Sequence, residues 1–151
     1  MFRTQLYTLI GLFFLLRFVP VFPRHTAPIP EPTERQTWTL VTEDVTATVY
    51  NAVPSQCNDD VAHTASMYRL NLDDVLSHRI VAMERTMMAE YGIRYGDRVL
   101  VEGAGRWDGE WQVEDTMNKR FAGQHKIDFL VPENIKHGKW ENVKLYIKTK
   151  D

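Results

Sequence analysis

The chain has 151 residues, about the length of one domain. Its 18 Lys and Arg against 20 Asp and Glu give a net charge of −2, which argues against a dedicated nucleic-acid binder. With 44% hydrophobic and 25% charged residues, the composition excludes a chain disordered throughout and a protein with many membrane spans. The single cysteine, Cys57, excludes an internal disulfide and a multi-cysteine zinc site.

The chain begins with an apolar segment of the kind that directs export. Arg3 precedes residues 6–16, an uncharged apolar stretch of 11 residues, and Arg17 follows it. This length fits the apolar region of a secretory signal, whereas a membrane-spanning helix needs about 20 residues. We interpret residues 1–22 as a signal peptide or an uncleaved membrane anchor. Both interpretations predict an exported protein of the cell envelope, secreted or anchored on the periplasmic side.

A proline-rich stretch follows this segment. Five prolines fall between residues 20 and 32, and such a density favours extended polyproline II and excludes a helix. We interpret residues 23–37 as a linker and predict that residues 38–151 form one domain.

The predicted domain consists of short stretches rich in β-branched and apolar residues, separated by turn-forming residues. The predicted strands are residues 40–50, 79–83, 98–102, 111–114, 127–131 and 143–148. Residues 84–91 and 132–136 predict two short helices. Six short strands with little helix indicate an all-β fold, and a small closed barrel fits this pattern better than a sandwich.

Three acidic residues stand at the ends of apolar strands and are the candidates for chemistry. Glu84 follows the strand at 79–83, Asp115 follows the strand at 111–114, and Asp128 lies at the start of the strand at 127–131. Burying a carboxylate costs solvation free energy, so such a residue usually has a partner or a functional role. Burial also raises the pKa of the carboxyl group, as a general acid requires. The alternative is structural: Asp115 caps a turn, and Asp128 pairs with a neighbouring basic side chain, Lys126 or Arg120.

An ordered set of short motifs resembles a known family. The set consists of Thr-Ala-Thr-Val-Tyr (46–50), His-Thr-Ala-Ser (63–66), Arg-Ile-Val-Ala-Met-Glu (79–84), Tyr-Gly-Asp-Arg-Val-Leu-Val (95–101), Val-Glu-Asp-Thr (113–116) and residues 123–129. Together these resemble the 3D (three-aspartate) domain, which is a double-psi β-barrel. This domain is the catalytic part of the membrane-bound lytic transglycosylase A family and of muralytic proteins of the stationary-phase-survival type. The resemblance, over residues 44–148, implies a six-stranded double-psi barrel preceded by an N-terminal hydrophobic helix and the Pro-rich linker.

The three family aspartates fall on Glu84, Asp115 and Asp128, and the threonine after the second one is Thr116. Two positions depart from the family pattern. Glu84 is one methylene longer than aspartate, and residues 117–118 are Met-Asn in place of the usual Gly-Gly. Glycine allows a backbone to approach a sugar ring closely, so side chains here are expected to reshape the groove.

The resemblance implies a peptidoglycan lytic transglycosylase, which cleaves the β-1,4 bond after N-acetylmuramic acid without water. One carboxylic acid protonates the glycosidic oxygen and then accepts the proton of the muramoyl 6-hydroxyl, which attacks C1 and closes a 1,6-anhydro ring. Asp115 and Asp128 are expected to be the catalytic pair, with Asp128 as the acid. The residues expected to bind substrate are Glu84, Tyr50, Thr64, Thr116 and His125.

No metal or other cofactor is implied, and the expected partner is the peptidoglycan glycan strand. Nucleic acid is not expected as a partner, a membrane is expected as one only if the N-terminal segment is retained, and the protein is expected to be a monomer. The alternative function is a non-catalytic barrel that binds or loosens the wall, similar to expansins and the rare lipoprotein A barrels. A purely structural barrel within a larger envelope complex also fits the sequence.

Overall fold

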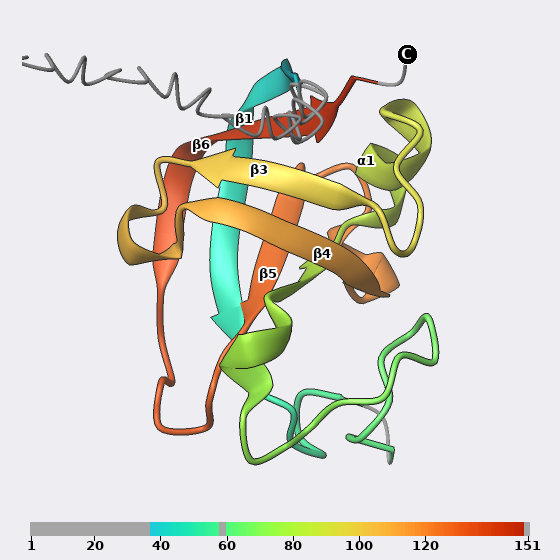
Figure 1. Cartoon of the computed structure of the whole chain (residues 1–151), viewed down its shortest axis with the longest axis vertical. Helices are drawn as coiled ribbons and strands as arrows, with labels where there is room; N and C mark the ends of the chain where they lie inside the picture. Colours follow the sequence, from blue (N-terminus) through green and yellow to red (C-terminus); the bar gives the residue numbers. More distant parts are fainter. Residues whose placement is uncertain (1–36, 58–59, 150–151) are drawn as a thin grey trace, which may run out of the picture. The chain divides into compact units, whose positions relative to one another are not determined.

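The computed structural model describes residues 37–57 and 60–149 (Figure 1). The predicted signal peptide or anchor at 1–22, and the predicted linker up to residue 36, lie outside the described residues. In the part of the chain that is described, no helix combines the length and the hydropathy needed to cross a membrane.

Six strands close into one barrel, which confirms the predicted all-β class with little helix. The strands are β1 (Trp38–Tyr50), β2 (Ile80–Met83), β3 (Arg98–Glu102), β4 (Gly109–Thr116), β5 (Lys126–Leu130) and β6 (Lys139–Lys148). Their order around the barrel is β1-β5-β2-β4-β3-β6, and β6 pairs with β1 to close it. The sheet is mixed, because β1 runs parallel to β5 and β2 parallel to β4, while the other pairs are antiparallel. In Figure 1, β3 and β4 cross the directions of β1 and β5 steeply.

The helices described are short. One α-helix, α1 (Arg85–Glu90), follows β2 and confirms the helix predicted at 84–91. Three single-turn 3₁₀ helices complete the set: η1 (Val75–His78), η2 (Gly105–Trp107) and η3 (Lys119–Phe121). The helix predicted at 132–136 is wrong. The chain makes one turn there, closed by a hydrogen bond from Ile135 N to Pro132 O (2.9 Å), and then extends into β6.

The barrel interior is filled by every second residue of each strand, because successive side chains on a strand point to opposite faces. The inward residues include Val45, Ala47, Val81, Met83, Val99, Val101, Trp111, Val113, Ile127, Phe129, Val143 and Leu145, all of them buried. The rings of Trp111 and Phe129 lie 4.5 Å apart at the centre of this core. This alternation leaves Thr48, Ala82 and Asp128 on the outer face.

The connection between β1 and β2 covers part of that outer face. It follows the end of β1 and lies at the lower end of the barrel in the view of Figure 1. Its apolar residues Leu70 and Val75 pack on Ile80 and Leu130, which point outward, and form a second small core. This second core holds the connection against the strands that carry the predicted site residues.

Candidate functional site

One row of paired residues crosses the outer face of the barrel and contains both predicted catalytic aspartates. On β2, Ala82 is the register partner of Asp115 on β4 and also of Asp128 on β5. Thr48 on β1 is in turn the partner of Asp128. An irregularity in the β2–β4 register between Val81 and Ala82 brings Asp115 into this row. Two strand spacings, about 10 Å, therefore separate the backbones of the two aspartates.

Asp115 is held by three hydrogen-bond donors. The Tyr50 hydroxyl donates to Oδ2 (2.9 Å), and the backbone N–H groups of Ala65 and Thr116 donate to Oδ1 (3.1 and 2.8 Å). These donors come from β1, from the covering connection and from β4 itself. Asp115 therefore stands at the junction of these three parts as an oriented, hydrogen-bonded carboxylate.

Asp128 lies in a different environment. It is half-buried and its Oδ1 accepts a hydrogen bond from the Thr48 hydroxyl. Burial raises the pKa of Asp128 from its ordinary 3.8 to about 6, the charge of Lys126 opposes that rise, and the charge of Asp115 adds to it. The Lys126 ammonium lies 4.4 Å from the centre of the Phe121 ring. Among the described residues, neither aspartate forms an ion pair within 4.0 Å.

Tyr50 links the two carboxylates. Burial raises the pKa of its phenol well above the usual value, and the negative charges of Asp115 and, more weakly, Asp128 add to that rise. The phenol therefore remains protonated and keeps donating to Asp115. Tyr50 thus contacts Asp115 directly through a hydrogen bond, whereas Asp128 affects it only through its charge.

A pocket of about 260 Å³ opens beside Asp115, and we call it the Asp115 pocket. Its walls come from the end of β1, the covering connection, the start of α1 and the end of β4. They include Tyr50, Thr64, Arg85, Asp115, Thr116 and Asn118. Asp128 is not among the lining residues. Met117 is buried, with 5% of its surface exposed, and Asn118 is the residue of the Met-Asn pair that reaches the pocket.

A second hollow lies on the other side of Asp128. Thr48, which donates to Asp128, lines it together with the turn at residues 136–139, and its volume is about 480 Å³. We call it the Thr48 hollow. The row Thr48, Asp128, Ala82, Asp115 thus leads from this hollow to the Asp115 pocket.

The five residues expected to bind substrate are divided between the pocket and other places. Tyr50, Thr64 and Thr116 line the Asp115 pocket. His125 lies elsewhere: it contacts Glu90 (Nε2 to Oε2, 3.4 Å) and the edge of the Tyr91 ring. The expected role of His125 in substrate binding stays a prediction.

Glu84 has a structural role within the barrel domain. It is 1% exposed and caps α1, accepting hydrogen bonds from the N–H groups of Thr86 (2.8 Å) and Met87 (3.1 Å) and from the Thr86 hydroxyl. Burial tends to raise the pKa of Glu84, but these hydrogen bonds outweigh it and the pKa is lowered. Its carboxylate therefore has a full set of partners before any ligand is considered.

Sequence reasoning missed three groups at the site. Thr48 was not considered, although the alternation of residues 46–50 puts it on the same face as Tyr50. Arg85 and the backbone N–H of Ala65 reach the pocket only through the folding of α1 and the covering connection, and no sequence pattern marks them.

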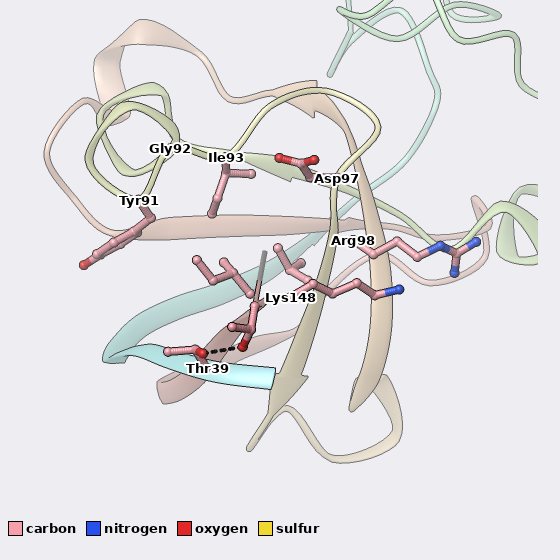
Figure 2. Close-up of a pocket in the computed structure, with 10 residues that line it drawn as sticks. Thr39, Tyr91, Gly92, Ile93, Asp97, Arg98 and Lys148 are labelled. Carbon is pink, nitrogen blue, oxygen red and sulfur yellow. Dashed lines mark hydrogen bonds between the residues drawn. The ribbon is translucent and has the colours of Figure 1, made fainter. Parts of the chain in front are cut away.

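A larger cavity, about 630 Å³, lies between the start of β1, the segment after α1, the start of β3 and the end of β6 (Figure 2). We call it the Ile93 pocket. Figure 2 shows Arg98 and Lys148 extending in one direction from it and Tyr91 lying on the opposite side. None of the predicted site residues lines it.

Comparisons of this chain with protein-family models, curated proteins and solved structures find no match. The class that the structure defines is therefore a closed, six-stranded mixed β-barrel with an acidic row on its outer face.

Proposed function

We propose that this barrel is a 3D-type double-psi domain that cleaves peptidoglycan glycan strands by lytic transglycosylation. The observation that carries the proposal is the row in which Asp115 and Asp128 flank Ala82 in contrasting environments. Two carboxylates whose surroundings differ in this way are the usual sign of separate acid and charge-stabilising roles. A closed, six-stranded mixed barrel supports the proposal at the level of overall architecture.

Asp128 is the general acid in this proposal. A pKa of about 6 keeps a large share of the group protonated in mildly acidic conditions. It gives its proton to the glycosidic oxygen as the bond from C1 to that oxygen breaks. The muramoyl 6-hydroxyl then attacks C1, and Asp128, now a carboxylate, accepts the hydroxyl proton. The acid is regenerated, no water is consumed, and the product carries a 1,6-anhydro ring.

Asp115, oriented by its three donors, is the charge-stabilising carboxylate in this proposal. Its charge helps to keep the proton on Asp128 and favours the positive charge that develops at C1 in the transition state. The Thr48 hollow and the Asp115 pocket lie at the two ends of the row, and this arrangement suits a linear polymer that passes across it. The apolar segment at 6–16 supports a site of action in the cell envelope, where this polymer lies.

The test is a digest of intact sacculi by the purified full chain, with soluble products read by mass spectrometry. We expect anhydro products that are lighter by one water than hydrolysed ones. Asp128→Asn is expected to lower their rate of release by roughly 10²- to 10⁴-fold, the usual contribution of a general acid. The wild-type rate is expected to fall as the pH rises above about 6, where Asp128 loses its proton.

The matched control is Glu110→Gln, which removes an exposed carboxylate from the same strand as Asp115. Its digest is expected to equal that of the wild type. Hydrolysed products in place of anhydro products would contradict the transglycosylase mechanism, and an undiminished rate in Asp128→Asn would contradict the assignment of the acid.

The alternative function is a barrel that grips the glycan without cleaving it. It is favoured by the complete hydrogen bonding of Asp115, which also serves to fasten Ala65 of the covering connection to β4. Asn118 lines the pocket at a position where the family has glycine, and this side chain also favours the non-catalytic alternative. Retention of the protein on sacculi without any soluble product identifies this function.

A further inference from the structure

Arg85 is the only Lys or Arg among the described residues that line the Asp115 pocket. It is exposed, and no ion pair within 4.0 Å joins it to an acid in the described part of the chain. His63 also lines this pocket, but its Nδ1 lies 2.9 Å from Asp60 Oδ2. The guanidinium of Arg85 is therefore the positive charge that the pocket presents to a ligand.

The backbone that carries Arg85 is fastened on both sides. Glu84, the residue before it, donates its N–H to Lys126 O on β5 (3.0 Å) and caps the first turn of α1 with its side chain. Thr86, the residue after it, accepts a hydrogen bond from Gly123 N (2.9 Å) in the connection between β4 and β5. These contacts fix the origin of the Arg85 side chain relative to β4 and β5, which carry the aspartates.

The charge balance of the pocket determines which ligands it accepts. The carboxylate of Asp115 repels a second anion, so an anionic ligand group needs a cation within the same pocket. A guanidinium is suited to this role because it meets a carboxylate with two parallel hydrogen bonds. Asn118, on the same wall, carries an amide N–H₂ group that adds donors.

We propose that Arg85 is a specificity-determining residue that binds a carboxylate of the glycan ligand and so selects strands with acidic substituents. This inference rests on the proposed function, because it names the ligand class of the same site. A muramoyl residue offers such a carboxylate in two ways: on its own lactyl group when no peptide is attached, and on the stem peptide when one is. A neutral glycan has neither carboxylate and therefore offers no group for Arg85 to bind.

The experiment measures binding of two pairs of small probes to the full chain by NMR titration. One pair is N-acetylmuramic acid and its methyl ester, and the other is a muramoyl peptide and its methyl ester. We expect the wild type to bind at least one acid roughly tenfold more tightly than its ester, as for a hydrogen bond to a charged group. The pair that shows the difference identifies the lactyl or the peptide carboxylate as the group bound.

Arg85→Gln is expected to remove this acid-to-ester ratio, and Arg85→Lys to retain part of it. The control Arg94→Gln makes the same change at an exposed arginine that does not line the pocket, and its ratio is expected to match the wild type. A ratio near one in the wild type, absence of binding, or an unchanged ratio in Arg85→Gln overturns the inference. A variant that merely folds less well lowers binding of acid and ester alike, so the ratio separates recognition from structure.

The outcome is independent of cleavage. If anhydro products are released but acid and ester bind equally, only the proposed role of Arg85 is refuted, and the transglycosylase proposal stands. A clear difference without cleavage refutes the transglycosylase and leaves an acid-recognising glycan-binding site.

Discussion

The Ile93 pocket and the Asp115 pocket differ in size and in chemistry. The Ile93 pocket is the larger of the two, about 630 Å³ against about 260 Å³. Several of its polar groups have partners close by: the hydroxyls of Thr39 and Thr149 lie 2.8 Å apart (Figure 2), and Asp97 accepts from Arg94 N (2.8 Å). The smaller pocket contains Asp115, which accepts three hydrogen bonds, and an arginine without an ion pair among the described residues. Asp128, whose pKa is raised, lies in the same row as Asp115 but does not line the pocket. The predicted site residues that line a cavity therefore line the smaller one, so cavity volume alone did not select the candidate site, and the environment of its charged groups did.

The largest expected effect on folding concerns the Ile93 pocket. Ile93 is buried and belongs to the main core, so Ile93→Ala removes packed methyl groups and enlarges a cavity. We expect the free energy of unfolding to fall by about 2–5 kcal/mol, measured by urea denaturation. Ile93→Val is expected to lose only about 0.5–1.5 kcal/mol. If the Ile93 pocket has no part in cleavage, the rate of cleavage per folded molecule of Ile93→Ala equals that of the wild type. A large change in this rate would contradict the functional distinction between the two pockets.

The next effect concerns the pH dependence of stability through Asp128. Its pKa is about 6 in the folded protein against an ordinary 3.8, so between these values the folded chain retains a proton that the unfolded chain has lost. The free energy of unfolding therefore falls as the pH rises from about 4 to 6, by at most about 3 kcal/mol. Asp128→Asn lacks this dependence and is expected to be more stable than the wild type above pH 7. Equal pH profiles in urea denaturation would show that the carboxyl is not perturbed.

The smallest effect comes from two tyrosines that each donate to a carboxylate. Tyr50→Phe removes a donor from Asp115 in a partly buried site and is expected to lower the free energy of unfolding by about 1–3 kcal/mol. Tyr146→Phe removes the donor to exposed Glu102 and is expected to change the free energy of unfolding far less, because water replaces the lost hydrogen bond. Thermal unfolding of both variants at one pH measures the difference. Equal losses would mean that the Asp115 hydrogen bonds are no more protected from water than a surface pair.

Sequence patterns predicted the six strands because each is a short stretch of β-branched or apolar residues bounded by turn-forming residues, and some of them also alternate. Val45, Ala47 and Val49 alternate with polar residues, and Val143, Leu145 and Ile147 do the same at the end of the chain. The length of β6 was underestimated, since residues 139–142 lack this alternation and pair with β1 only in the closed barrel. The helix predicted at 132–136 failed because a proline and polar residues suit a turn as well as a helix start.

The candidate site shows the same division. Asp115 and Asp128 were predicted from their position at the ends of apolar strands, and their contrasting environments were not. The Thr48–Asp128 hydrogen bond joins residues 80 apart in the chain, and the Tyr50–Asp115 bond joins residues 65 apart. Such partners depend on strand order and register, which local patterns do not encode.

By itself, the sequence determined the class of fold, because strand patterns are a local property of the chain, and it marked Asp115 and Asp128 as acids at the ends of apolar strands. Only the tertiary structure decided that Ala82 pairs with both aspartates, that Glu84 caps α1 and that Arg85 enters the Asp115 pocket. These facts follow from barrel closure, which sets the register between strands far apart in sequence and so determines which charges influence one another.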